Sequence, residues 1–493
     1  MASGTTRERN PGRPGAWLPA QRLREALLGP LERFLHLQAA SGIVLLAAAA
    51  AALVWANSPW WHSYERLWHT PLTLGVGSWQ IQRDLHFWIN EFLMTIFFLV
   101  AGLEIKRELA AGALSDLKRA ALPVAAALGG MLAPALIYTA LNPAAPARSG
   151  WGIPMATDIA FAVGVVVLLG RRVPPAVRVL LLAVAIIDDL GAILVIAIFY
   201  ASGFDPQGLL VLGGGVAFML LLRAAGVRPG IGYIFPLTVI WVGLYQTGVH
   251  PTIAGVIVAF ATPVEPWLER RHFIELAQQA LAEFQRRFEQ GRGEHELLEP
   301  LRTLTQAGRE AVSPAVRGEV FFHPWVAFLI MPLFALANAG VRLGELDLGR
   351  PGALGVLLGV SGGLVLGKPL GVLGLSWLAV RCGLCRLPRG VGWHGVALLG
   401  AAAGIGFTMA IFIAELAFTD PMLLNAAKLG VLLATALAAL LAVALGRALA
   451  LPPRPPAEEL TESQIERENA YWESTGESAR PEVEPVLGID PRD

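Results

Sequence analysis

The sequence predicts an all-α membrane protein, and three observations lead to this fold class. Hydrophobic residues make up 55% of the chain and charged residues only 15%, whereas a soluble domain is nearer a quarter charged. The apolar residues form long uncharged blocks, each long enough to cross a bilayer. Because backbone in lipid must satisfy its hydrogen bonds internally, each block is expected to be a helix. The formal net charge is zero, so the charge balance gives no reason to expect nucleic acid as a partner.

About twelve such helices are expected within a transmembrane domain over residues 35–450. Their expected spans are 36–57, 85–106, 120–141, 153–170, 177–200, 207–224, 230–246, 250–263, 323–343, 352–380, 395–417 and 422–449. Three segments lie outside them: an Arg-rich tail over 1–34, a charged, helix-prone insert over 264–322, and an acidic, Pro-rich tail over 451–493. The last lacks apolar residues for a core and is expected to be disordered. No cleavable signal peptide is expected, because polar and mixed residues precede the first block.

Lysine and arginine residues gather in alternate loops, and this distribution predicts the orientation of the helices. Lys106 and Arg107 follow helix 2, and further positive residues follow helices 4, 6 and 10. Three of the intervening loops, 201–206, 247–249 and 418–421, carry no lysine or arginine. Since positive loops face the cytoplasm, both termini and the 264–322 insert are expected there.

The first outside loop has the pattern of a β-hairpin. Its sequence, PLTLGVGSWQIQRDL, alternates apolar and polar residues around a Gly-x-Gly. A hairpin over about residues 71–83 is therefore expected. An isolated two-stranded hairpin is marginal in water, so it is expected to pair with a copy from another subunit.

Four ionisable residues lie near the middle of predicted helices: Asp158, Asp188, Asp189 and Lys368. Charged side chains at mid-depth are costly and mark functional sites by default. Neighbouring helical residues point about 100° apart, so Asp188 and Asp189 are expected to border one cavity from different directions. Carboxylate oxygens bind small hard cations and also protons, so the two compete. Lys368 is the expected counter-charge, and a purely structural role is less consistent with three aspartates and one lysine.

Two of the predicted helices carry interruptions. Helix 4 contains Pro154 and the polar pair Thr157–Asp158 near its start, and helix 11 contains Gly404 and Gly406. Unwound backbone at mid-depth is tolerated only where it lines a cavity or is buried in protein. Paired broken helices in two halves of a chain indicate a transporter site. The glycines are equally compatible with close helix packing.

Other polar residues lie nearer the ends of the helices. Glu104 is compatible with an ordinary solvated helix end. His250 is either an interfacial residue or a pH-related one. Glu415 is expected to pair with Lys428, because both lie a similar distance from the turn that joins their helices.

Taken together, seven stretches resemble the NhaA family of bacterial Na⁺/H⁺ antiporters over about residues 35–450. The stretches are FFLVAGLEIKREL, PMATDIAFAVGV, AIIDDLGAI, GVHPTIAGVIVAF, HPWVAFLIMPLFALANAGV, LGKPLG and GIGFTMAIFIA, in this order. The resemblance implies inverted repeats whose broken helices, 4 and 11, cross. It also implies a secondary transporter of the bacterial inner membrane that is not an enzyme and needs no cofactor.

The resemblance further assigns roles to matching residues. Asp188 and Asp189 match the pair that binds Na⁺ or Li⁺ and exchanges it for H⁺, and Lys368 matches the lysine that pairs with the first of them. Thr157 and Asp158 match the pair at the crossing of the broken helices. The implied pH-regulation group is Glu104, Arg107, Glu108, His250 and Glu319. The family forms homodimers through a hairpin that matches residues 71–83, whereas the 264–322 insert is longer than expected and puts the arrangement around Glu319 in doubt.

The predicted function is therefore electrogenic, pH-regulated exchange of cytoplasmic Na⁺ or Li⁺ for external H⁺, which serves sodium and pH homeostasis. Two alternatives belong to other classes. An intramembrane aspartyl protease needs aspartates on neighbouring helices, but an opposing lysine would disturb a shared proton and its Gly-x-Gly-Asp arrangement is missing. A cation channel lined by acidic side chains would show a pore-loop or fourfold pattern, which the sequence lacks.

Overall fold

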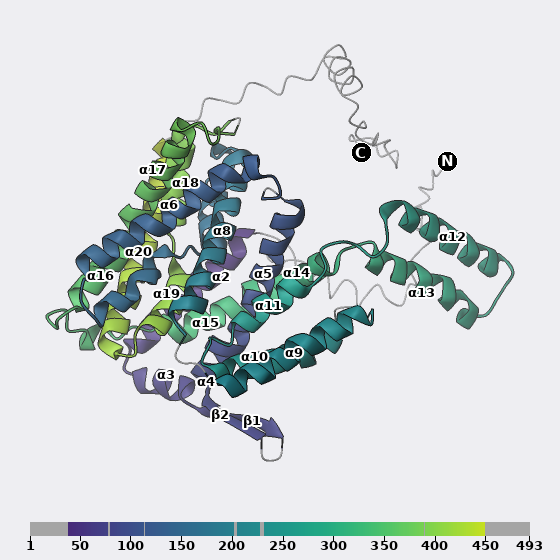
Figure 1. Ribbon diagram of the computed structural model, residues 1–493, viewed down its shortest axis with the longest axis horizontal. Coiled ribbons are helices and arrows are strands. Elements are labelled where there is room, and N and C mark those ends of the chain that lie inside the picture. The colour runs from purple at the N-terminus through teal and green to yellow at the C-terminus, as the bar shows by residue number, and fades with distance from the viewer. Residues whose placement is uncertain are drawn as a thin grey trace, which may run out of the picture. The chain divides into compact units, whose positions relative to one another are not determined.

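The computed structural model describes residues 38–76, 79–112, 114–201, 205–226, 231–388 and 390–448, and these residues are mostly helical (Figure 1). Within these ranges seven helices are long and apolar enough to cross a bilayer, or up to ten if each of three bent helix pairs forms one span. The seven are Leu85–Ala111, Arg119–Leu141, Pro175–Phe199, Pro206–Ala224, Pro314–Asn338, Ala353–Arg381 and Pro421–Ala448. The predicted helical membrane class is confirmed, whereas the count of twelve stays a prediction. The tails expected over 1–34 and 451–493 lie outside the described residues.

Three of these spans contain a wide π-helical turn. The first consists of α4 (Leu85–Phe87), η2 (Trp88–Leu93) and α5 (Met94–Ala111); the second of α14 (Pro314–Trp325), η6 (Val326–Ile330) and α15 (Met331–Asn338); the third of α16 (Ala353–Gly362), η8 (Gly363–Gly367) and α17 (Lys368–Arg381). Such turns often occur at functional sites. Lys368 is the residue that directly follows η8, so the π turn sets its direction into the core.

Two bent helix pairs coincide with the interruptions expected from the sequence. η3 (Ala147–Met155) and α7 (Ile159–Leu168) meet at a bend of 45°, and α18 (Trp393–Ala403) and α19 (Phe407–Ala417) meet at a bend of 47°. Pro154 ends the first pair's leading helix, and Gly404 to Gly406 separate the second pair. A third bend of 117° joins α2 (Gln38–Ala56) to α3 (Trp61–Trp68), an element that the sequence did not predict.

The remaining helices surround these spans. α6 (Leu117–Leu141), α8 (Pro175–Phe199), α9 (Pro206–Ala224) and α20 (Pro421–Ala448) run without a break, and α10 (Ile234–Thr247) and α11 (Ile253–Ala261) are shorter. α6 packs directly on α17, where Gly129 and Gly371 face each other. A Cβ on Gly371 would overlap the carbonyl oxygen of Gly129, so only glycine allows this approach. The same helix pair brings Gly130 beside Lys368 and Asp188.

The predicted hairpin is present. β1 (Pro71–Val76) pairs with β2 (Trp79–Asp84) in antiparallel register, with Pro71 opposite Asp84 and Val76 opposite Trp79. These two strands form a two-stranded sheet whose outer edges carry no further strand of the described chain. Asp84 ends β2 and accepts a hydrogen bond from the Phe87 backbone N–H at 2.9 Å, which caps α4. The hairpin is therefore fixed directly to the start of a membrane span.

Most of the expected 264–322 insert is helical. α12 (Arg270–Glu289) and α13 (Glu294–Glu310) pack against each other as an antiparallel pair (Figure 1). The helix expected over 323–343 was placed too far along the chain: it begins at Pro314 and ends at Asn338. Ser313 caps its start by accepting a hydrogen bond from the Val316 N–H, a signal that the charged surroundings concealed. The last residues of the expected insert, Glu319 among them, therefore belong to this span.

Candidate functional site

Asp158 connects the two helix breaks. Its backbone N–H donates to the carbonyl oxygen of Ile405 at 2.7 Å, so the two interruptions touch. Its carboxylate accepts from the Phe161 N–H at 3.1 Å and from the Thr408 hydroxyl at 2.5 Å and N–H at 3.2 Å. One buried carboxylate thus caps the first turns of both α7 and α19. Helix N-termini carry partial positive charge, which stabilises an anion there.

Lys368, Asp188 and Thr157 form a buried triad next to this point. The Lys368 ammonium donates to Asp188 Oδ2 and, at 2.5 Å, to the Thr157 hydroxyl. The Thr157 hydroxyl lies 2.6 Å from Asp188 Oδ2 and 3.0 Å from the carbonyl oxygen of Ala403. Lys368 has no exposed surface and Asp188 only 2%, so the ion pair is removed from solvent. A charge in such a place requires a partner of opposite sign.

Asp189 differs from Asp188 although the two are adjacent. It is 4% exposed, and its Oδ1 has no hydrogen-bond partner among the described residues. It lines a cavity of about 340 Å³ that also reaches Asp158. A buried acceptor without a partner is costly unless something else satisfies it. The cavity therefore presents a carboxylate that is available to a proton or a small cation.

Four of the residues assigned to pH regulation gather in the same cavity region. Glu104, Arg107 and Glu319 line the cavity. The Arg107 guanidinium lies 3.5 Å from a carboxylate oxygen of Glu108 and 3.5 Å from one of Glu319. The long insert therefore does not separate Glu319 from the group, because Glu319 lies on α14, which packs against α5.

The fifth residue of that group, His250, lies elsewhere. It lines a second cavity of about 640 Å³, together with Asp84 and residues of the hairpin. His250 Nδ1 is 2.7 Å from the Thr252 hydroxyl, and Nε2 is 3.1 Å from Glu91 Oε1. The side chain is only 7% exposed, so His250 is buried within the protein. The residues assigned to pH regulation are divided between two cavities.

The sequence led to the main charged residues of the site but not to all of their partners. The pairing of Glu415 with Lys428 is confirmed, with 2.5 Å between the two charged atoms. Thr408, Glu91 and His86 were missed as partners of Asp158, His250 and Glu415, respectively. Glu91 could have been identified from the sequence, because it is a charged residue within the otherwise apolar stretch WINEFL.

The arrangement defines the class of protein. No group of three or more His, Cys, Asp or Glu side chains in the described ranges is placed to hold a metal ion, so these residues do not form a resident metal centre. Instead, buried carboxylates and one lysine meet between broken membrane helices, beside a cavity. These features are those of a secondary ion transporter, which alternates the access of one buried site.

Comparison with known proteins gives the particular family. The family described as Na⁺/H⁺ antiporter 1 matches residues 32–445. The Na⁺/H⁺ antiporter NhaA 2 of Sorangium cellulosum is 60% identical over 449 residues, which cover 91% of this chain and 96% of that protein. The NhaA proteins of Cupriavidus necator (53%; 90% of this chain and 95% of that protein) and Myxococcus xanthus (NhaA 2, 52%; 93% and 97%) are similarly related. The chain belongs to the NhaA family of Na⁺/H⁺ antiporters.

This membership confirms the transporter class and the exchange of Na⁺ for H⁺ expected from the resemblance. The protein is a multi-pass membrane protein and not an enzyme. Neither the channel nor the protease alternative is favoured.

Proposed function

We propose that the protein extrudes cytoplasmic Na⁺ or Li⁺ in exchange for external H⁺, and that Asp188 and Asp189 carry the exchanged ions. The observation that carries this proposal is the contrast between the two carboxylates. Oδ1 of each aspartate is buried without a hydrogen-bond partner in the described chain. However, Asp188 Oδ2 is held by Lys368, whereas Asp189 borders the cavity. Oxygen ligands suit small hard cations, and the same oxygens bind protons. No cofactor is needed for this competition.

In the proposed cycle, a cation enters the cavity and takes the place of the proton on Asp189. Asp188 turns from Lys368 to the cation, and the ammonium gives up its proton as the pair separates. Thr157 and Asp158 supply further oxygens at the contact of the helix breaks. When more positive charge moves in one direction than in the other, the membrane potential drives the cycle by about 2.3 kcal/mol per charge per 100 mV. The exchange is therefore proposed to be electrogenic.

The orientation follows from the charges at the two ends of the spans. Lys106 and Arg107 lie at the same end of α5 as the smaller cavity, and positive loops favour the cytoplasm. The smaller cavity is then open to the cytoplasm, and the larger cavity beside the hairpin faces the outside. This arrangement supports cytoplasmic termini in the bacterial inner membrane. The proposed count of twelve spans requires that α10 and α11 also cross the membrane. The proposed inverted repeats require that the two bent helix pairs, η3–α7 and α18–α19, cross each other.

Regulation by pH is assigned to the charged groups at the cavity mouths. Arg107 lies between Glu108 and Glu319, and Glu104 is beside them in the cytoplasmic cavity. Protonation of these carboxylates would reduce the negative charge at the cavity and so weaken the electrostatic attraction on an entering cation. His250 and Glu91 form the corresponding pair in the external cavity.

The hairpin is proposed to join two copies of the chain. No further strand of the described chain pairs with its outer strand edges, and strand addition from a second copy would extend the sheet. An isologous pairing of this kind produces a symmetric dimer.

The proposal is tested with everted membrane vesicles that carry a respiration-driven pH gradient, monitored with a fluorescent pH probe. Addition of Na⁺ should dissipate the gradient in wild-type vesicles and leave it intact with Asp189→Asn. Asp205→Asn is the matched control, because Asp205 caps α9 at an exposed position and asparagine can keep that cap. Unchanged Na⁺-dependent dissipation by Asp189→Asn would refute the assignment.

A further inference from the structure

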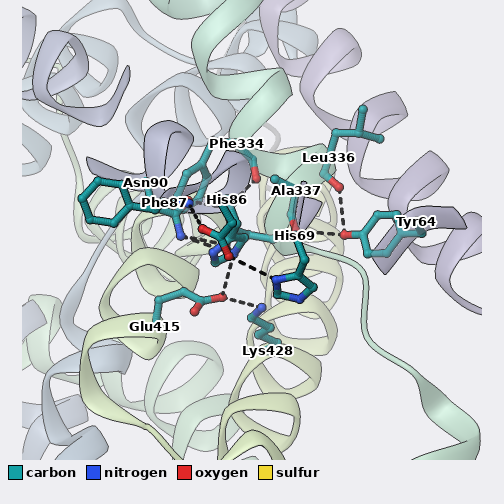
Figure 2. Close-up of polar contacts among 12 residues, drawn as sticks. Tyr64, His69, His86, Phe87, Asn90, Phe334, Leu336, Ala337, Glu415 and Lys428 are labelled. Atoms are coloured by element: carbon teal, nitrogen blue, oxygen red, sulfur yellow. Dashed lines mark hydrogen bonds and ion pairs between the residues drawn. The ribbon is translucent and has the colours of Figure 1, made fainter. Parts of the chain in front are cut away.

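Glu415, Lys428 and His86 form a largely buried network near the C-terminal end of α19 (Figure 2). Glu415 and His86 also line the larger cavity. Lys428 Nζ of α20 lies 2.5 Å from Glu415 Oε1, and His86 Nε2 of α4 lies 3.8 Å from the same oxygen. The side chains of Lys428 and Glu415 are 9% and 15% exposed. Glu415 therefore joins α19 to α20 through Lys428, and His86 of α4 faces the same carboxylate oxygen.

Two asparagines fix the hydrogen-bonding state of His86. Asn338 of α15 donates its amide hydrogens to Asn90 Oδ1 at 2.8 Å and to the Phe334 carbonyl oxygen at 2.9 Å. Its own Oδ1 is thus an acceptor, and His86 Nε2 lies 2.8 Å from it. His86 Nε2 must carry a hydrogen and donate it. The network consequently includes α15 and η2 as well as α4, α19 and α20.

A wall of aromatic rings separates this cavity from the aspartates. Phe412 lies three residues before Glu415 on α19 and lines the larger cavity, whereas Phe97 lines the smaller one. Phe98 joins them, with ring centroids 5.5 Å from Phe412 and 5.2 Å from Phe97. The Phe412 ring also contacts Phe334. These contacting rings thus connect the lining of the larger cavity to that of the smaller cavity, which Asp158 and Asp189 also line.

Helix α19 links the wall to the cation site. Thr408 in its first turn donates to Asp158, and Glu415 lies near its other end. The two residues are about two helical turns apart, roughly 10 Å. A displacement of Phe412 between them must therefore change the contacts of Glu415, of Thr408, or of both.

We propose that the network of Glu415, Lys428 and His86 is a lock that keeps the external cavity closed to the cation site in the inward-open conformation. The lock separates when the site opens to the outside. Glu415 and Lys428 are positioning residues, because they act through α19 and touch neither the cation nor the exchanged proton. This inference rests on the orientation and the cation site proposed above. The Glu415–Lys428 contact sets the balance between the inward-open and outward-open conformations.

The lock predicts a result that depends on the side of the membrane. A ligand that binds only one conformation shows an apparent dissociation constant divided by the fraction of protein in that conformation. Without the lock the outward-open fraction rises, so the KM for external Na⁺ falls and the KM for cytoplasmic Na⁺ rises. A loss of folded protein instead lowers the maximal rate from both sides and leaves both KM values unchanged.

The experiment compares everted vesicles, which expose the cytoplasmic face, with right-side-out vesicles from the same cells. Na⁺-dependent proton flux is measured over a Na⁺ series for wild type, Glu415→Gln and Lys428→Met. The ratio of cytoplasmic to external KM is expected to rise about fivefold or more, as is typical of a conformational coupling. Each single variant leaves one buried charge unpaired and can impair folding. The double variant E415Q/K428M removes both charges, is compatible with folding, and should show the same change in ratio.

The matched control is Asp420→Asn, which removes an exposed ion pair with Arg350 (3.5 Å) at the turn before α20. Both KM values should remain at the wild-type level in this control. A double variant with an unchanged KM ratio, or with both KM values raised together, would overturn the lock. Asp189→Asn is measured in the same vesicles: if it transports normally, the proposed cation site fails, whereas the KM ratio of the double variant still decides on the lock.

Discussion

Lys368 and Asp188 lie 180 positions apart in the chain, and their side chains form a fully buried ion pair between α17 and α8. Gly130 of α6 lies against this pair, so a third helix closes the space around it. The hydroxyl of Thr157 contacts both charged groups. The pair is therefore the contact that a cation must disturb to reach Asp188.

Removing the lysine should destabilise the protein as well as stop exchange. In Lys368→Met the Asp188 carboxylate loses the ammonium that pairs with it, which for a buried pair costs about 3–5 kcal/mol. The double variant D188N/K368M carries no unpaired charge and should recover most of the stability without recovering transport. Thermal unfolding of the purified proteins in detergent, followed by tryptophan fluorescence, measures both effects. Equal stability of the single and double variants would contradict the claim that the Lys368–Asp188 ion pair stabilises the protein.

The close packing of α6 on α17 should require a glycine at position 371, where the side chain is a single hydrogen atom. Gly371→Ala places a methyl group on the carbonyl oxygen of Gly129, so the helices must move apart and the free energy of unfolding should fall by about 1–3 kcal/mol. Gly374→Ala is the control on the same helix, because its Cβ would meet open space. Denaturant unfolding in detergent compares the two variants. A Gly371→Ala protein as stable as Gly374→Ala would show that the helices do not approach so closely.

The sequence predicted the features that depend on local pattern. Apolar blocks of sufficient length marked the spans, and Pro154 and the Gly404–Gly406 segment marked the breaks. Alternation marked the hairpin, and equal depth in the bilayer suggested both lysine–carboxylate pairs. These inferences succeed because each rests on a period, a length or a cost that is already present in the chain.

The remaining features depend on tertiary contacts that no local pattern encodes. Asp158 reads as the cap of its own helix, but its bond to Thr408 exists only because the second break lies beside it. His86 and Glu91 lie near a span end, where polar residues are ordinarily solvated, and only the fold shows their partners. The three π turns are likewise not marked by residue type. The early start of α14 was hidden by the charged residues around Glu319.

The hairpin should determine the oligomeric state. Replacement of residues 72–83 by a short Gly-Ser linker removes the open strand edges but keeps Asp84, which caps α4. The variant is expected to be a folded monomer in detergent, and the wild type is expected to be a dimer. Light scattering coupled to size-exclusion chromatography measures the mass. A variant that remains dimeric would place the interface on another surface.

The helix pair α12 and α13 should lose stability in acid. Hydrogen bonds from Arg286 and Arg287 lower the pKa of Glu283, so this carboxylate is more acidic in the folded helix than in the unfolded chain. Its contribution is present above the unfolded pKa and is lost as the pH falls through the folded pKa. Amide hydrogen exchange in α12 should therefore accelerate, after correction for intrinsic rates, between about pH 5 and about pH 3.

Two variants check this assignment of the acid response. Glu283→Gln should weaken the response, because glutamine has no charge to lose. Glu275→Gln, at an exposed position of the same helix, should leave it unchanged. A wild-type response that persists in full in Glu283→Gln would assign it to other groups.

The central claim is that a cation and protons compete for the aspartate pair, and proton release on Na⁺ binding tests it most directly. Purified protein is placed in weakly buffered detergent solution with a pH indicator, and NaCl is added, with choline chloride as the ionic-strength control. The wild type should release protons on addition of Na⁺ but not of choline, and Asp189→Asn should release none. Equal release by wild type and Asp189→Asn, or Na⁺ binding without any release, would contradict the account.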